Sequence, residues 1–393
     1  MITFCIPSKN NLRYLKSCIP SIQKNSHYKN DIIVFIDQDL DGTEDWLKEH
    51  NITYIVNHES ECKGIGYAYD TMFKAATTEY VLAFHADMIM GKDADLNLLK
   101  HYTDKTIVCS TRIEPPLHPP SPDKISIDFG LWPEEFLETK FNEQVKLISE
   151  QNADKTNQGV FAPWLIKKSD HINHDPIFLS VFEDSDLFLR YKIAGFNLLQ
   201  SLDSIVYHLT CRGGQFEHAS TTADLNTKSN EWRRKSDLSY REFIRKWGFT
   251  HKNTPYLDPI PSKKYNTAFI IHDCNLQVLE LLEPWCDRIY VTERFNVGRA
   301  WDYVEMEGNN TSFDLTKRVL NINENDPYAE NDIILEFNAQ HFNQNSFNII
   351  QNLSDIITES GTVGQFELDC FIITIHQLTD YSNELIYLSD NNR

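Results

Sequence analysis

Short runs of apolar, often β-branched residues alternate with longer amphipathic stretches from residue 2 to residue 84. The runs expected as strands span residues 2–6, 31–36, 52–56 and 80–84, and the stretches expected as helices span residues 12–23, 43–50 and 66–76. Strands joined by crossover helices pair side by side in the same direction. The sequence therefore predicts an α/β fold with a mainly parallel sheet flanked by helices.

Polar residues begin where three of these apolar runs stop. Residues 7–10 follow the first run, Asp37 ends the second, and residues 85–87 follow the run at 80–84. In open α/β sheets the ligand crevice lies outside the carboxyl ends of the strands. We therefore expect a binding site at the edge of the sheet where these three polar segments meet.

The length and composition of the chain allow two domains. With 393 residues and 41% hydrophobic content, the chain can bury a substantial core. Residues 253–264 are rich in proline and polar groups, which is typical of a linker. We predict a first domain over residues 1–252, this linker, and a smaller α/β accessory domain of unassigned role over residues 265–393.

The net charge of −20 argues against a broad binding surface for nucleic acid or anionic lipid. The eight cysteines are scattered without a C-x-x-C pair, which favours reduced thiols and a cytoplasmic location. No segment approaches the roughly 20 apolar residues of a membrane span. The expectation is a soluble protein without a transmembrane segment, with peripheral membrane association through a partner left open and the oligomeric state undetermined.

Carboxylates at two expected element ends have the chemistry of a catalytic site. Asp87 follows a buried strand and is the first candidate for a metal ligand, with a cap of a turn or helix as the alternative. His85 is a weaker candidate, because a histidine at a strand end is more often packed or capped. Asp184 begins an expected helix at residues 184–194, where it acts either as a general base or as an acid that complements the helix dipole.

Other residues have a structural and a functional interpretation. Trp132 and Trp164 can offer an aromatic face to a sugar, although core packing is the default for tryptophan. His171 and His174 have His-x-x-His spacing, but without nearby cysteines or an intervening glutamate we interpret them as loop residues and not as zinc ligands. The proline-rich residues 115–122 predict an irregular surface loop.

Several segments together resemble a known family. They are residues 4–10, 32–39, 62–70, 79–87, 159–168, 182–190 and 206–208. In this order and spacing they resemble the inverting family 2 nucleotide-sugar glycosyltransferases of GT-A fold, over about residues 1–215. The joint pattern is more specific than any single motif. The resemblance implies a GT-A, Rossmann-like sheet for the first domain.

The resemblance also implies roles for individual residues. The nucleotide-sugar donor is expected to contact Pro7, Ser8, Lys9, Asn10, Asp37, Lys63, Gly64, His85, Ala86 and Arg212. Asp37 is implied to contact the base, and Arg212 to pair either with phosphate or in a surface salt bridge. Asp87 and His208 are implied to hold Mn²⁺ or Mg²⁺, in a signature whose first acid is replaced here by His85. Asp184 is the implied base, with Glu183 supporting the acceptor.

The predicted function is the transfer of a sugar from a nucleoside diphosphate sugar, with UDP favoured, to a hydroxyl group of a glycan or other acceptor. One alternative is a sugar-1-phosphate nucleotidyltransferase, although residues 8–13 lack the glycine-rich, basic loop of that class. The other is a non-catalytic carbohydrate- or nucleotide-binding protein that has kept the fold, which His85 supports.

Overall fold

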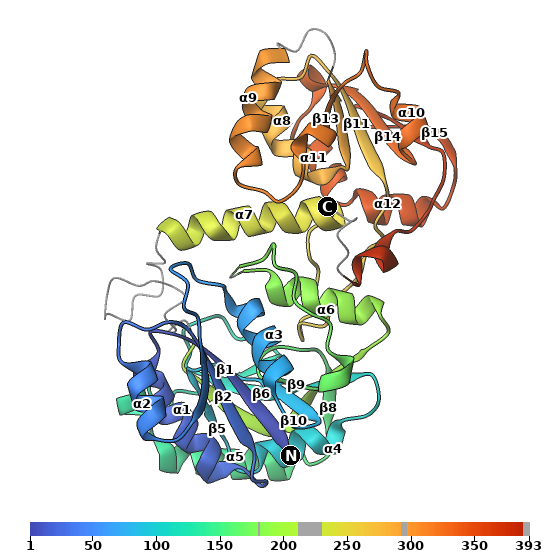
Figure 1. Ribbon diagram of the computed structural model, residues 1–393. Coiled ribbons are helices and arrows are strands. Elements are labelled where there is room, and N and C mark those ends of the chain that lie inside the picture. The colour runs from blue at the N-terminus through green and yellow to red at the C-terminus, as the bar shows by residue number, and fades with distance from the viewer. Residues whose placement is uncertain (180, 211–229, 292–296, 388–393) are drawn as a thin grey trace. The chain divides into compact units, whose positions relative to one another are not determined.

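The computed structural model describes residues 1–179, 181–210, 230–291 and 297–387 (Figure 1). The chain divides into two compact units. Unit 1 comprises Met1–Lys235 and Asn253–Ile260, and unit 2 comprises Ser236–Lys252 and Pro261–Arg393. The division thus differs from the expected one, since residues 236–252 belong to unit 2 and residues 253–260 to unit 1.

Unit 1 contains a ten-stranded sheet in the order β3-β2-β1-β4-β9-β6-β10-β5, with β7 beside β6 and β8 beside β10. Its strands are β1 (Ile2–Lys9), β2 (Asp31–Gln38), β3 (Thr53–Val56), β4 (Tyr80–Ala83), β5 (Met88–Met90), β6 (Thr106–Glu114), β7 (Lys124–Ser126), β8 (Thr156–Gln158), β9 (Trp164–Lys167) and β10 (Asn197–His208). The pairs β1–β2, β1–β4, β2–β3 and β6–β10 are parallel, whereas β9 runs antiparallel to β4 and β6. The predicted mainly parallel α/β sheet is confirmed.

Helices flank this sheet (Figure 1). They are α1 (Leu12–Asn25), α2 (Thr43–Glu49), α3 (Ile65–Ala75), α4 (Ala94–His101), α5 (Glu138–Gln151) and α6 (Glu183–Ile193), with 3-10 turns η1 (Pro133–Glu135) and η2 (Lys168–Asp170). Helix α7 (Asn230–Trp247) begins in unit 1 and continues into unit 2. One apolar cluster joins Tyr14 of α1 and Phe141 of α5 to Ile205 and Tyr207 of β10. On β9, Trp164 packs edge-on against Phe73 of α3. The expected helix at residues 184–194 is α6, and Gly195 follows it with a φ of +81°.

Burial explains why the sequences of β1 and β4 are continuous apolar runs. Residues Ile2 to Ile6 are buried without interruption, and so are Val81 to Phe84. Central strands of a parallel sheet are covered on both faces, so their sequences do not alternate. The register pairs Cys5 with both Ile33 and Ala83, which brings the carboxyl ends of β1, β2 and β4 to one edge.

The segment 253–260 is held against unit 1. Lys192 donates to both carboxylate oxygens of Asp258, at 2.9 and 2.8 Å. Gly159 has a φ of +152°, and a β-carbon at this position would lie 2.0 Å from the carbonyl oxygen of Tyr256. A glycine is therefore required where the backbone at Tyr256 passes it.

Unit 2 has a six-stranded sheet in the order β13-β12-β11-β14-β16-β15. Its strands are β11 (Thr267–His272), β12 (Arg288–Val291), β13 (Val319–Asn321), β14 (Ile333–Asn338), β15 (Gly364–Leu368) and β16 (Phe371–Ile375). Its helices are α8 (Leu276–Leu282), α9 (Val297–Gly308), α10 (Pro327–Glu330), α11 (Gln344–Gln351) and α12 (Leu353–Ser360), with 3-10 turns η4 (Glu283–Trp285), η5 (Leu315–Lys317), η6 (Ala339–His341) and η7 (Ser382–Leu385). The neighbouring strands β13, β12, β11 and β14 run parallel to one another, and β16 is antiparallel to β14. A second α/β sheet is thus present in the C-terminal part.

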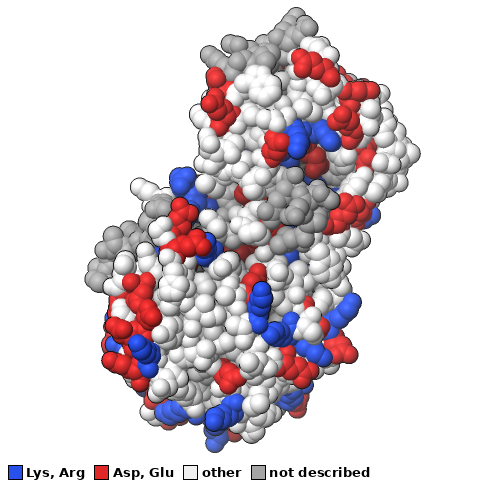
Figure 2. All heavy atoms as spheres, in the orientation of Figure 1, with Lys and Arg blue, Asp and Glu red and all other residues white. Residues whose placement is uncertain are grey.

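The surface carries both signs of charge. Figure 2 shows acidic side chains over the visible face with lysines and arginines interspersed among them. Within the described part of the chain, no helix combines the length and apolar character needed to cross a membrane. Seven of the cysteines lie in the described ranges, and all seven are free thiols.

Candidate active site

A cavity of about 120 Å³ lies at the carboxyl edge of β1, β2 and β4. The predicted donor-site residues that line it are Pro7, Ser8, Lys9, Asp37, Gly64, His85 and Ala86, and the predicted metal ligand Asp87 lines it as well. Asn11, Cys62, Ile65, Ala68, Leu179, Trp232 and Lys235 complete its described lining. The expectation of a site at this edge therefore coincides with a cavity, and most of the expected donor residues face it together.

The end of β1 contributes an unsatisfied polar atom to the cavity. Ser8 is 1% exposed, and its hydroxyl has no hydrogen-bond partner among the described residues. A buried hydroxyl without a partner is costly, so its position in the cavity wall is suited to a ligand that accepts or donates a hydrogen bond. The nearby Asn10, in contrast, has hydrogen-bond partners within the protein. Its side chain donates to Gln38 at 2.9 Å and accepts from the Leu40 amide at 2.7 Å.

Asp37, at the end of β2, holds the turn that precedes α3. One carboxylate oxygen accepts from the Lys63 amide at 2.8 Å, and the other accepts from the Gly64 amide at 3.0 Å. The Lys63 ammonium pairs with Glu59 and does not belong to the described lining. Gly64 has a φ of +84°, and a β-carbon there would lie 2.0 Å from the carbonyl oxygen of Leu179. Asp37 thus shapes the cavity wall through the backbone of this turn.

His85, Asp87 and His208 form a group able to hold a metal ion. One ligand atom from each lies within 4.8 Å of the others. Asp87 and His208 are 7% and 6% exposed, and the His208 Nε2 atom is 3.5 Å from Asp87 Oδ1. The opposite nitrogen of His208 donates to Glu114 at 2.8 Å. The group therefore combines one carboxylate with two imidazoles, and one of these has a fixed orientation.

Burial and charge set the protonation of this group. Burial lowers the pKa of His85 to about 4, so this imidazole is neutral and has a free lone pair at neutral pH. Burial acts in the same direction on His208, but Asp87 and Glu114 outweigh it and raise the pKa of His208 to about 9. Burial raises and His208 lowers the pKa of Asp87, with a net decrease that keeps the carboxylate ionised. A metal ion that binds Nε2 of His208 must therefore displace a proton.

The first turn of α6 provides a second pair of acids. Asp184 accepts from the Ser185 amide at 2.6 Å. In Glu183, the Oε2 atom is shielded from solvent and has no partner among the described residues. Burial and the adjacent Asp184 raise the pKa of Glu183 to about 8. The first turn of α6 therefore places a carboxyl group that is mostly neutral at pH 7, that of Glu183, next to Asp184 in the sequence.

Tyr69 is influenced electrostatically both by the acids of α6 and by Asp87 of the metal-binding group. This buried phenol on α3 is 4% exposed, and its pKa is raised first by burial and then by Cys5, Glu183, Asp87 and Asp184. Asp87 and Asp184 thus act electrostatically on the same side chain, although neither acid of α6 is among the described residues that line the cavity. Asp87 and Asp184 therefore both lie close enough to Tyr69 to act on it.

A family comparison identifies this region. Residues 3–162 match the family model described as glycosyl transferase family 2. Over these residues, unit 1 matches a family 2 glycosyltransferase domain. The resemblance seen in the sequence is confirmed over these residues. The match ends before Glu183, Asp184 and His208, so the roles of these three residues stay predictions.

Solved structures of glycosyltransferases are similar to the chain at low identity. GalNAc-T7 with UDP, GalNAc and Mn²⁺ has 10% identity over 63% of this chain and 48% of its own, with a TM-score of 0.44. S. aureus TarS 1-349 in complex with UDP has 12% identity over 62% and 80%, with a TM-score of 0.38. The mannosyltransferase PcManGT from Pyrobaculum calidifontis with GDP-Man and Mn²⁺ has 14% identity over 62% and 61%, with a TM-score of 0.38. The chain spans about half the length of the first of these, and no curated protein matches it.

The two tryptophans predicted to contact the acceptor differ in exposure. Trp164 is 3% exposed and packs against Phe188 at 5.7 Å as well as Phe73, so it has no free face for a sugar. Its role is core packing. Trp132 is partly buried, and the Arg13 guanidinium lies 4.4 Å from its ring centroid. Its acceptor role stays a prediction, and Arg212 lies outside the described residues.

Two residues of α7 were not predicted as part of the site. Trp232 and Lys235 line the cavity although they lie more than 140 residues from Asp87 in the sequence. A tryptophan and a lysine close together can serve to stack on a base and to pair with phosphate, respectively. Their presence on a basic amphipathic stretch was the available signal, but nothing local in the sequence connects that stretch to the strand ends.

Proposed function

We propose that unit 1 transfers one sugar from a nucleoside diphosphate sugar, with UDP favoured, to a hydroxyl group of a glycan or other glycoconjugate acceptor. The observation that carries the proposal is that one cavity is lined by the unpartnered Ser8 hydroxyl and by His85 and Asp87, two members of the group that His208 completes. A group able to hold a metal ion beside this cavity suits a diphosphate donor better than a simple sugar.

The donor atoms of this group fit Mn²⁺ better than Mg²⁺. Imidazole nitrogens suit transition metals, whereas Mg²⁺ prefers an all-oxygen shell. Asp87 and His208 would hold the ion, with His85 as a neutral third ligand. When bound, a divalent cation offsets the negative charge that develops on the leaving diphosphate.

The acids of α6 supply the acceptor chemistry in this proposal. Asp184 takes the proton of the acceptor hydroxyl while that oxygen bonds to the anomeric carbon and the bond from this carbon to the diphosphate breaks. One such displacement inverts the configuration at the anomeric carbon. Glu183, neutral at pH 7, donates a hydrogen bond that positions the acceptor.

The test uses the full chain and a panel of nucleoside diphosphate sugars, with and without Mn²⁺. We expect one donor to raise the melting temperature in the presence of Mn²⁺, and that donor to be consumed when acceptor glycans are added. Asp184→Asn is expected to lower turnover by about 10² to 10⁴-fold and to keep the donor-induced stabilisation. Equal turnover in Asp184→Asn rejects its role as base.

The same assay separates the alternatives. Binding of a donor without transfer or hydrolysis favours a non-catalytic binding protein, for which the histidine in place of the first acid is the supporting observation. Release of pyrophosphate from a nucleoside triphosphate and a sugar 1-phosphate favours a nucleotidyltransferase. Transfer with retention of configuration contradicts the single displacement.

A further inference from the structure

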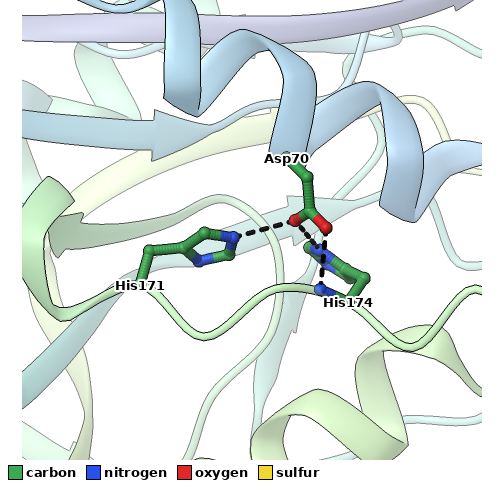
Figure 3. A group of neighbouring side chains, drawn as sticks. All are labelled: Asp70, His171 and His174. Carbon is green, nitrogen blue, oxygen red and sulfur yellow. Dashed lines mark hydrogen bonds and ion pairs between the residues drawn. The ribbon is translucent and has the colours of Figure 1, made fainter. Parts of the chain in front are cut away.

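A second group of metal-binding side chains lies outside the donor cavity. Asp70 of α3 meets His171 and His174, which lie in the segment between η2 and α6 (Figure 3). The carboxylate oxygen Oδ1 is 2.8 Å from His171 Nε2 and 2.6 Å from His174 Nδ1. The backbone amide of His174 donates to the second carboxylate oxygen at 2.9 Å.

We propose that Asp70, His171 and His174 form a zinc site that fixes the segment before α6 to α3. Two imidazoles and one carboxylate are a known ligand combination for Zn²⁺, with the fourth position taken by water. The ligand atoms all lie within 4.8 Å of one another. The Asp70 side chain is 22% exposed, whereas those of His171 and His174 are 7% and 5% exposed. The open position therefore faces solvent on the carboxylate side.

The surroundings hold both imidazoles in place. The Tyr191 hydroxyl lies 3.0 Å from Nδ1 of His171 and also accepts from the Ile172 amide at 2.9 Å. A fixed partner on the second nitrogen is a regular feature of metal-bound histidine, because it orients the ring and selects the nitrogen that faces the ion. Nε2 of His171 is thereby directed at Asp70.

His174 is held by close packing. Its ring stacks on Tyr69 with a centroid distance of 6.0 Å and an interplanar angle of 23°. A β-carbon at Gly66 would lie 2.8 Å from the β-carbon of His174. The absence of a side chain at Gly66 therefore lets the histidine approach α3, which places Nδ1 beside the carboxylate one turn further along the helix.

The geometry requires a small adjustment for an ion to enter. A tetrahedral zinc with bonds of about 2.0 Å holds its ligand atoms about 3.3 Å apart. The present distances are those of hydrogen bonds, so Asp70 must withdraw by about half an ångström on metal binding. Its exposed side is the direction open to this movement, since the two histidines are packed against Tyr69 and Phe73.

A substitution in the donor-site group allows metal binding at the second group to be measured by itself. Ile65 and Ala68 of α3 line the donor cavity, and Asp70 is not part of the described lining. The full chain carrying Asp87→Asn lacks the charged ligand of the donor-site group and leaves the second group intact. We expect this variant, freed of metal by chelation and then exposed to Zn²⁺, to bind one equivalent by elemental analysis. Co²⁺ in place of Zn²⁺ should give a visible ligand-field absorption.

Variants in this background test the ligands. Asp70→Asn and His171→Gln are each expected to weaken Zn²⁺ binding on the order of 100-fold, and Tyr191→Phe about 10-fold. His272→Gln is the matched control, because its side chain is 42% exposed and pairs with Glu336 in unit 2. If His171→Gln does not fold, the near-isosteric Asp70→Asn decides. Lack of zinc binding by the Asp87→Asn chain, or unchanged binding by a folded Asp70→Asn variant, would overturn the proposal.

Discussion

Glu114, at the end of β6, fixes the imidazole of His208 through a 2.8 Å hydrogen bond to Nδ1. This bond leaves the Nε2 atom directed at Asp87. Glu114 itself is oriented by Lys124 at 3.0 Å and by Arg112 at 3.0 Å. A carboxylate behind a metal-bound histidine sets which nitrogen binds and raises its basicity.

Glu114→Gln is therefore expected to weaken Mn²⁺ binding by about 10- to 100-fold. The amide can keep the shape of the side chain but not the charge that stabilises the histidine. Calorimetric titration of Mn²⁺ in the presence of donor nucleotide measures the effect. Glu134→Gln is the control, because Glu134 is exposed and pairs only with Arg13 among the partners described. Equal affinity in a folded Glu114→Gln variant contradicts this positioning role.

The protonation of Glu183 predicts an alkaline decline in activity. Its pKa is raised by burial and by Asp184, so the neutral form exists below about pH 8 and is lost as the pH rises through that value. We expect kcat/KM to fall in the same range, because an ionised Glu183 cannot donate to an acceptor hydroxyl. The measurement is a pH profile of transfer.

Glu183→Gln isolates this effect, because glutamine stays neutral and can still donate. The variant is expected to keep transfer activity and to lack the decline above pH 8. An unchanged alkaline limb in this variant would assign the decline to another group. Asp184→Asn serves as the reference, since its loss of activity is expected at every pH.

The unpartnered hydroxyl of Ser8 predicts opposite effects on stability and binding. Ser8→Ala removes a buried polar atom without a partner, so the free protein is expected to gain about 1 kcal/mol in unfolding free energy. Donor binding is expected to weaken by a similar amount, because the bound donor loses its hydrogen bond to the Ser8 hydroxyl. Chemical denaturation and donor titration measure the two quantities.

Ser21→Ala is the matched control for Ser8. The Ser21 hydroxyl is also buried but donates to the Cys18 carbonyl at 2.6 Å and accepts from the Met90 amide at 2.9 Å. Its removal leaves two buried backbone groups with one partner fewer, so destabilisation by about 1 to 3 kcal/mol is expected. Destabilisation of equal size in both variants would show that Ser8 is satisfied in solution.

Alanine substitutions at Gly64 and Gly42 distinguish the cost of backbone strain from that of a steric clash. Both have positive φ values, of +84° and +81°, but only Gly64 would place a β-carbon 2.0 Å from another backbone atom. Gly42→Ala is expected to cost about 1 kcal/mol, the price of the left-handed conformation alone. Gly64→Ala is expected to cost more and to weaken donor binding, because the turn held by Asp37 must move. Similar melting temperatures for the two variants would contradict the close packing at Leu179.

The strands that form the cavity edge were predictable because their signal is local. In β1, β2 and β4 each apolar run is followed at once by the polar residues that face the cavity, and burial on both faces makes the run continuous. β10 was not predicted, because its pairing with β6 shifts register between Ser201 and Ile205 and polar residues interrupt the run.

Side chains brought together over long separations could not be predicted. Asp70 and His171 lie 101 positions apart and meet only because β9 returns antiparallel beside β4. Interpreting His171 and His174 as loop residues described their backbone correctly but could not find their common partner. Glu114 was missed for the same reason, since its relation to His208 depends on the parallel pairing of β6 with β10.

The attachment of residues 253–260 to unit 1 has a practical consequence for dividing the polypeptide. A shortened gene ending at residue 252 would leave Lys192 without Asp258 and would uncover the backbone at Gly159, only a few residues before β9. Proteolytic nicking or fusion experiments that aim to study unit 1 alone should therefore retain residues 253–260.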